Sequence, residues 1–232
     1  MKNFLQLMRS RWNSGAGALV AILIVGLLNN NLSTDLTVGQ LTPELRAVTQ
    51  GAFYRFWQAL RAVVYMGAVV LWALDQRHRL SLAVLGLNGL FTVQLFVATI
   101  FLVLRLLQHV PITVPILLRD GLIIFATNIL TFALWYWFID SDDTRLFREA
   151  AQLSWDFLFP QRQAALPGYE DWKPRFVDYV FLAYMTSVAF SPTDTAPLSR
   201  TAKMLMVAQS VISLIVIAVI AGTAINMLAG NA

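Results

Sequence analysis

The sequence predicts an all-α, polytopic membrane protein with about five transmembrane helices and a re-entrant half-helix before the last of them. Of its 232 residues, 58% are hydrophobic and only 13% are charged, whereas soluble domains carry about 25% charged residues. The mean hydropathy is +0.64, and several segments approach the ~20 apolar residues that a helix needs to cross hydrocarbon. This composition leaves too few polar residues to cover a soluble enzyme, so that class is excluded first.

The residue counts remove several further kinds of chemistry. The chain has no cysteine, which excludes disulfides, thiolate metal ligands and a cysteine nucleophile. Its only histidines, His78 and His109, give no basis for most zinc or haem sites. The formal net charge of +4 is typical of Lys and Arg in cytoplasmic loops, and no basic run favours nucleic acid. We therefore expect no metal, no cofactor and no nucleic-acid partner.

The first four predicted spans lie in the N-terminal part of the chain. Residues 15–32 form the shortest; basic residues precede it as in a signal peptide, but no cleavage pattern follows, and we favour an uncleaved segment. Residues 53–74 open with aromatic side chains, and residues 80–107 are long enough to tilt or protrude. Residues 121–139 end in clustered Trp and Tyr just before Asp140, which is typical of the headgroup level.

The rest of the chain holds a polar region and one more full span. Residues 203–228 are apolar and rich in β-branched side chains, but in lipid the backbone bonds must close within the segment, which favours helix. In the polar region, residues 144–157 have helical spacing and predict an amphipathic helix stopped by Pro160, either at the membrane surface or as a plain surface helix. We accordingly divide the chain into residues 1–139, 140–175 and 176–232.

A short apolar segment before the last span carries the functional prediction. Residues 176–190 would make a helix of ~22 Å, short of the ~30 Å hydrocarbon core. Residues 191–197 follow with two prolines and cannot form a regular helix. A half-length helix, a polar loop and a full span outline a re-entrant loop, which is tolerated only where protein or a water-filled cavity covers it.

The stretch over residues 176–203 resembles the pore-loop potassium channel superfamily. Family members place an aromatic-rich pore helix before Thr-Thr-Val, a Gly-Tyr-Gly filter and then Asp-x-x-Pro. Residues 186–188 (Thr-Ser-Val) look like the first part and residues 194–197 (Asp-Thr-Ala-Pro) like the last. Residues 189–191 (Ala-Phe-Ser) stand where the glycines are expected, and residues 192–193 look like an insertion. Because the filter backbone uses glycine, the usual potassium selectivity is not expected.

The resemblance, over about 55 of the 232 residues, implies an ion-channel-like homotetramer around the loop, with monovalent cations as candidate ions. Hydroxyl groups of the loop, or a ring of Asp194 carboxylates, would form the constriction. Asp178 lies in the pore helix. Gln209 and Ser213 share one face of the last span and either line a vestibule or hydrogen-bond between helices, and we favour the second role. The pore and filter candidates are Thr186, Ser187, Val188, Ala189, Phe190, Ser191, Thr193 and Asp194.

Other stretches are similar to a family of uncharacterised bacterial integral membrane proteins. They are residues 134–137, 155–160, 190–194 and 224–228. This second resemblance implies a multi-pass protein of the bacterial inner (plasma) membrane, with the lipid bilayer as its environment, and brings no activity with it. No catalytic motif is present, so we expect no enzyme. The alternative to a channel is a non-conducting structural or accessory membrane subunit.

The sequence leaves the membrane orientation open. Lys2, Arg9 and Arg11 favour a cytoplasmic N-terminus. Five crossings would then open the loop to the cytoplasm and end the last helix outside, whereas the channel family has the opposite arrangement. The conflict disappears if residues 15–32 lie in the interface, if the N-terminus is outside, or if residues 176–190 form a short sixth span.

Overall fold

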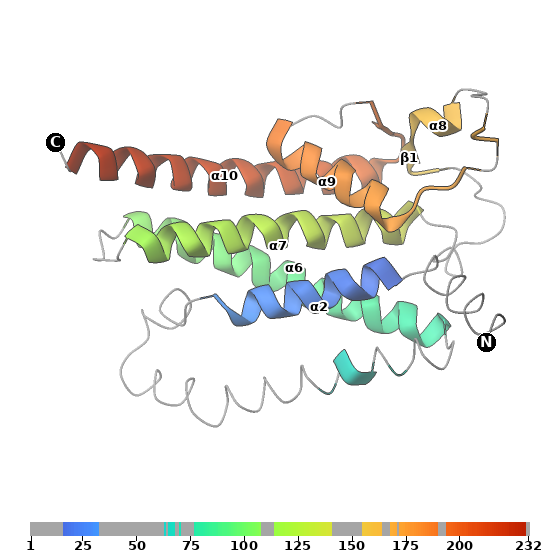
Figure 1. Ribbon diagram of the computed structural model, residues 1–232, viewed down its shortest axis with the longest axis horizontal. Helices are drawn as coiled ribbons and strands as arrows, with labels where there is room; N and C mark the ends of the chain where they lie inside the picture. Colours follow the sequence, from blue (N-terminus) through green and yellow to red (C-terminus); the bar gives the residue numbers. More distant parts are fainter. Residues whose placement is uncertain are drawn as a thin grey trace. The chain divides into compact units, whose positions relative to one another are not determined.

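The described part of the chain is helical, with a single pair of two-residue strands (Figure 1). In a computed structural model, the described residues are 16–32, 63, 65–67, 70, 77–107, 114–140, 155–163, 168–170, 172–189 and 194–230. The helices are α2 (Ala16–Asn30), α6 (Arg77–Leu107), α7 (Val114–Asp140), α8 (Pro160–Gln163), α9 (Phe176–Ala189) and α10 (Arg200–Gly230), and the strands are β1 (Phe157–Leu158) and β2 (Ala196–Pro197).

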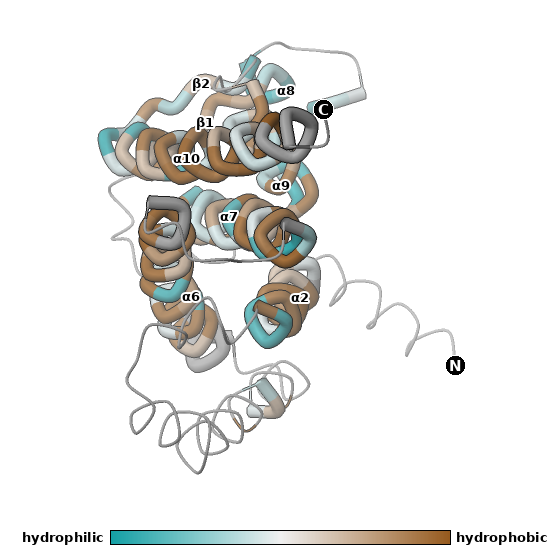
Figure 2. The backbone as a smooth tube through the Cα atoms, turned by 90° about the vertical axis from the view of Figure 1, so that its left-hand side faces the viewer, coloured by the Kyte–Doolittle hydropathy of each residue, from teal (hydrophilic) through white to brown (hydrophobic). Residues whose placement is uncertain are grey.

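Among the described residues, three helices are long and apolar enough to cross a membrane: Leu82–Leu104 in α6, Pro115–Asp140 in α7 and Arg200–Ile225 in α10. Figure 2 shows hydrophobic residues along most of their length. They confirm the third, fourth and fifth predicted spans as helices, and the chain has the make-up of a multi-pass membrane protein. α2 and α9 are apolar but shorter. The predicted second span lies largely outside the described residues, of which Val63, 65–67 and Val70 are helical.

Helix α7 starts earlier than the sequence predicts, at Val114 and not at Gly121. The start predicted from the sequence is too late because that prediction takes the charged residues Arg119 and Asp120 to lie outside the apolar span. Pro115 suits the first turn of a helix because it has no N–H to leave unpaired. The Arg119 guanidinium lies 3.2 Å from the Asp120 carboxylate, so both charges fit within the first turns of α7.

The predicted amphipathic helix over residues 144–157 is wrong at its C-terminal end, and residues 144–154 lie outside the described part of the chain. Phe157 belongs to β1, which pairs antiparallel with β2 in the register Phe157↔Pro197. The Leu198 N–H extends the pairing by donating to the Asp156 carbonyl at 2.8 Å. Pro160 begins α8 and does not end a helix. Pairing with a distant strand overrides the local helical spacing here.

The chain divides into two units. The first contains Met1–Ile24 and Asn128–Leu214, and the second contains Val25–Thr127 and Ile215–Ala232. In the second unit, α7 and α10 approach closely where a Cβ on Gly121 would stand 2.9 Å from Cγ1 of Ile220. The first unit holds α8, α9 and both strands together with parts of α2, α7 and α10. The three-part division by composition stays a prediction.

Gly17 allows α2 to pack against α9 within the first unit. A Cβ at Gly17 would lie 2.9 Å from Cβ of Phe176, an atom next to the backbone that cannot move away cheaply. We expect Gly17→Ala to destabilise the fold by about 1–3 kcal/mol through this overpacking. Gly86→Ala in α6 is the matched control, because nothing lies within 4 Å of its added Cβ. It should be neutral or slightly stabilising. Thermal unfolding in detergent compares the two, and equal shifts would contradict the close contact.

Candidate functional site

The candidate site is the surroundings of α9 in the first unit, where α9 lies beside the C-terminal half of α7 and the N-terminal half of α10 (Figures 1 and 2). The first turn of α9 is capped by Asp178, a residue that the sequence places in a pore helix. Asp178 Oδ2 accepts the Arg175 N–H at 2.6 Å, and the Asp178 N–H donates to the Arg175 carbonyl at 2.9 Å. A carboxylate at this place also faces the positive end of the helix dipole.

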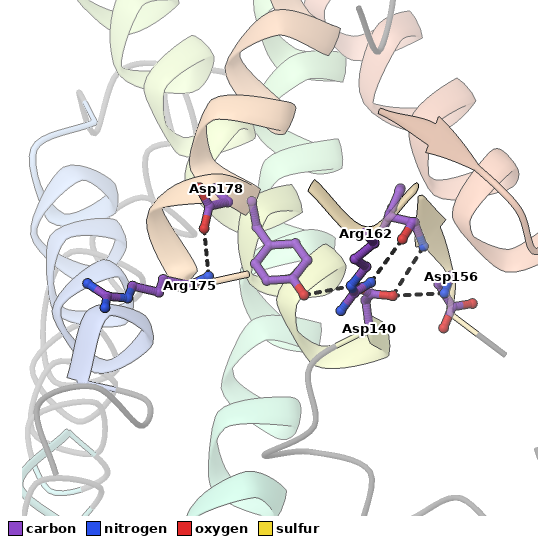
Figure 3. Close-up of polar contacts among 7 residues, drawn as sticks. Asp140, Asp156, Arg162, Arg175 and Asp178 are labelled. Carbon is purple, nitrogen blue, oxygen red and sulfur yellow. Dashed lines mark hydrogen bonds and ion pairs between the residues drawn. The ribbon is translucent and has the colours of Figure 1, made fainter. Parts of the chain in front are cut away.

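A buried carboxylate ends α7 and collects four donors, which Figure 3 shows. Oδ1 of Asp140 accepts the N–H groups of Asp156 and Phe157 at 2.8 and 3.1 Å. Oδ2 accepts Nη1 of Arg162 at 2.9 Å and the Tyr179 hydroxyl at 2.8 Å. We call these five residues the Asp140 cluster. It joins α7, the β1–α8 segment and α9.

The Asp140 cluster contains a buried ion pair whose carboxylate accepts hydrogen bonds through both oxygens. The side chains of Asp140 and Arg162 are 0% and 8% exposed. Burying both charges is costly, and a negative charge at a helix C-terminus is unfavourable, so the added donors are needed. Arg162 also donates to the Phe157 carbonyl at 2.9 Å, and its guanidinium lies 4.9 Å from the centre of the Trp155 ring. Burial, reinforced by the Asp140 carboxylate, raises the pKa of Tyr179, which keeps its hydroxyl protonated as a donor.

Both ends of the segment from α9 to β2 meet at this same end of α7. At its start, Tyr179 bonds to Asp140. At its finish, β2 pairs with β1, whose Phe157 N–H also bonds to Asp140. α10 then begins at Arg200, where the Ser199 hydroxyl accepts the Ala202 N–H at 3.1 Å as an N-cap. The chain therefore leaves the Asp140 cluster along α9 and returns to it.

The C-terminal half of α9 is held by Gln209 of α10. Gln209 is fully buried. Its Nε2 donates to the Ala183 carbonyl at 2.7 Å and to the Ser187 hydroxyl at 2.8 Å. Its Oε1 accepts the Tyr136 hydroxyl of α7. Gln209 lies nine residues beyond Arg200, about 14 Å along α10 at 1.5 Å per residue. A single amide therefore links three helices about one helical turn from the Asp140 cluster, since Tyr136 comes four residues before Asp140 and Ala183 four residues after Tyr179.

Ser213 makes the second contact between α7 and α10 in this unit. Asn128 Nδ2 donates to the Ser213 hydroxyl at 2.8 Å and to the Gln209 carbonyl at 3.3 Å. Ser213 is fully buried, as Gln209 is. Hydrogen bonding between helices, the favoured role, is thus observed for Gln209 and Ser213. Lining a vestibule stays a prediction.

The residues predicted as a filter divide into three groups. Thr186 and Ser187 are buried in α9, and the Thr186 hydroxyl donates to the Leu182 carbonyl at 2.8 Å. Their hydroxyls therefore bond inside the chain. Val188 and Ala189 end the helix on its exposed side, and Asp194 is exposed in a turn. Residues 190–193, which include Phe190, Ser191 and Thr193, lie outside the described residues.

Sequence reasoning missed the Asp140 cluster. In the sequence analysis Asp140 only marks the headgroup level. Arg162 is 22 residues away among other loop charges. No spacing rule connects them. Among the residues that the structure describes, no group of three or more His, Asp or Glu side chains could hold a metal ion. Comparisons with protein-family models, with curated proteins and with solved structures find no match to the chain.

Proposed function

We propose that the chain is an ion-channel-like membrane protein in which the segment from α9 to β2 is a re-entrant pore loop. The supporting observation is that this segment starts and finishes at the Asp140 cluster. α9 has 14 residues, about 21 Å of helix, which reaches only part of the way across a ~30 Å hydrocarbon core. Together with α2, the second predicted segment, α6, α7 and α10, the loop completes a five-span protein of the bacterial inner membrane.

In this proposal copies of the chain assemble as a tetramer and conduct monovalent cations past the loop. The C-terminus of α9 carries the partial negative charge of the helix dipole and points it at the loop. Asp194, exposed beyond the loop, adds a full negative charge that favours cations. Because Thr186 and Ser187 bond inside the chain, the constriction falls to residues 188–194.

The rival function is a non-conducting structural or accessory subunit. One observation favours it: both hydroxyls that match the filter motif, on Thr186 and Ser187, are used for packing. Ala189 and Ser191 also replace the glycines of the usual filter. On this account the loop is a packed turn in a monomer or a hetero-complex.

A cysteine-block experiment tests the channel. The natural chain has no cysteine, so a single substitution gives one reactive thiol. We expect purified protein in liposomes to pass K⁺ or Na⁺, and a cationic methanethiosulfonate reagent to cut the flux of Val188→Cys roughly tenfold or more by placing bulk and charge in the constriction. Val93→Cys is the matched control, since Val93 is 63% exposed on α6, and its flux should not change.

The oligomeric state is measured on the same sample by mass photometry. A tetramer with flux that is blocked only in Val188→Cys supports the pore loop. Flux that the reagent leaves intact in Val188→Cys would remove the loop from the ion path. A monomer that passes neither K⁺, Na⁺ nor protons would favour the accessory subunit.

A further inference from the structure

The Asp140 end of the first unit, marked by Asp140, Phe176 and Arg200, is also where α2 begins. Gly17 in the first turn of α2 packs on Phe176. Phe176 in turn meets Trp137 of α7 edge to face, with ring centres 6.4 Å apart. The N-terminus of α2 and the start of α9 therefore share one end of α7.

The other end of α2 lies beside the start of α7. In the second unit, Nη2 of Arg119 donates to the Asn31 carbonyl at 3.2 Å. In the first unit α2 begins beside Phe176, near the end of α7, and in the second unit it ends beside the first turns of α7. A helix lying flat in the membrane interface would not follow a spanning helix in this way. Helix α2 has 15 residues, about as few as α9, but its two ends lie beside opposite ends of α7. For this inference we therefore count α2 as a crossing segment.

The positive charges divide unequally between the two sides of such a bundle. α6 ends six residues before α7 begins, so if both cross, α6 starts on the side where α7 ends. On the predicted topology, in which α2 and residues 53–74 also cross, the sequence assigns 12 of the 17 Lys and Arg residues to that side, which holds the Asp140 end, and three, Arg46, Arg105 and Arg119, to the other. Arg55 and Arg61 fall inside the second predicted span. The 12 are Lys2, Arg9, Arg11, Arg77, Arg79, Arg145, Arg148, Arg162, Lys173, Arg175, Arg200 and Lys203.

We propose that the Asp140 end faces the cytoplasm, so that α9 enters the membrane from the cytoplasmic side and α10 ends on the outer side. An excess of Lys and Arg in short loops marks the cytoplasmic side of membrane proteins. Arg175, Arg200 and Lys203 are exposed there, where they meet the anionic headgroups of the cytoplasmic leaflet. This is the reverse of the pore-loop potassium channels. The inference rests on the spans and the charges and does not require conduction.

Two single cysteines test the orientation in the otherwise cysteine-free chain. Tyr169→Cys reports the Asp140 end, since Tyr169 is 46% exposed in the segment before α9. Asn31→Cys reports the opposite end, since Asn31 is exposed in the turn after α2. A membrane-impermeant maleimide should label Tyr169→Cys in inverted inner-membrane vesicles, and Asn31→Cys in right-side-out vesicles, each roughly tenfold more strongly than in the opposite preparation.

A second measurement keeps the test decisive if a cysteine variant does not fold. Alkaline phosphatase fused after Ala232 of the full chain should be active, because α10 ends on the outer side, and green fluorescent protein at the same place should be dark. The reversed labelling pattern, equal labelling from both sides, or a fluorescent fusion without phosphatase activity would each overturn the proposal. None of these readouts depends on ion flux, so failure of the orientation and failure of the channel are told apart.

Discussion

Arg162→Gln is expected to destabilise the protein by about 3–5 kcal/mol, the cost of leaving one charge of a buried pair without its partner. The Asp140 carboxylate is fully buried, and the variant leaves it at the negative end of the α7 dipole with neutral donors only. The loss should show as a large fall in the unfolding temperature in detergent. Because the pair joins α7 to the β1–α8 segment, hydrogen exchange should rise first in that segment and in the first turn of α9.

Arg175→Gln is the matched control for this prediction. It makes the same change in an exposed arginine near the same end of α9, and surface charges contribute about 0–1 kcal/mol. The double variant Asp140→Asn with Arg162→Met should recover much of the loss, because replacing both partners of a buried pair is often neutral. Equal unfolding temperatures for Arg162→Gln and Arg175→Gln would show that the ion pair does not hold this end of the fold.

The helices themselves follow from the sequence because hydrocarbon imposes simple rules. A helix that crosses needs length and apolar side chains, and α6, α7 and α10 have both. α9 is also predictable, since Pro174 comes before it, its residues are apolar and two prolines follow. The start of α7 is misplaced because charges next to an apolar run look like a boundary. Arg119 and Asp120 instead pair with each other within the helix.

The contacts that fix α9 depend on pairs distant in sequence, which no local pattern predicts. Phe157 has helical spacing to its neighbours, yet it pairs with Pro197. The four-residue spacing of Gln209 and Ser213 gives their common face correctly but not their partners on α7 and α9. The match of Thr186 and Ser187 to a filter motif predicts that their hydroxyls line a pore. The packing of α9 turns both hydroxyls inward.

Two buried polar groups hold α9 in different ways. The Asp140 cluster holds its start by an ion pair at the end of α7. Gln209 holds its C-terminal half by neutral hydrogen bonds in the apolar part of the bundle. Neutral bonds suit that depth because a charge there would have to be desolvated. These two contacts therefore fix the start and the C-terminal half of α9.

Gln209→Leu is expected to cost about 3–5 kcal/mol. It removes three hydrogen bonds, to Tyr136, Ala183 and Ser187, each worth about 0.6 kcal/mol between membrane helices. It also leaves the buried hydroxyls of Tyr136 and Ser187 without this partner, which adds a desolvation penalty of about 1–3 kcal/mol. Leucine has a similar volume, so no large cavity contributes. Thermal unfolding in detergent measures the change.

Ser213→Ala is the control, because the Ser213 side chain shares one bond, with Asn128, and its loss should cost about 1 kcal/mol. Ser187→Ala tests whether Gln209 acts through α9. If it does, the losses of Ser187→Ala and Gln209→Leu should sum to more than the loss in the double variant, since both remove the same bond. Additive losses, or a Gln209→Leu variant no less stable than Ser213→Ala, would mean that Gln209 merely fills space. α9 would then be held by the Asp140 cluster and apolar packing alone.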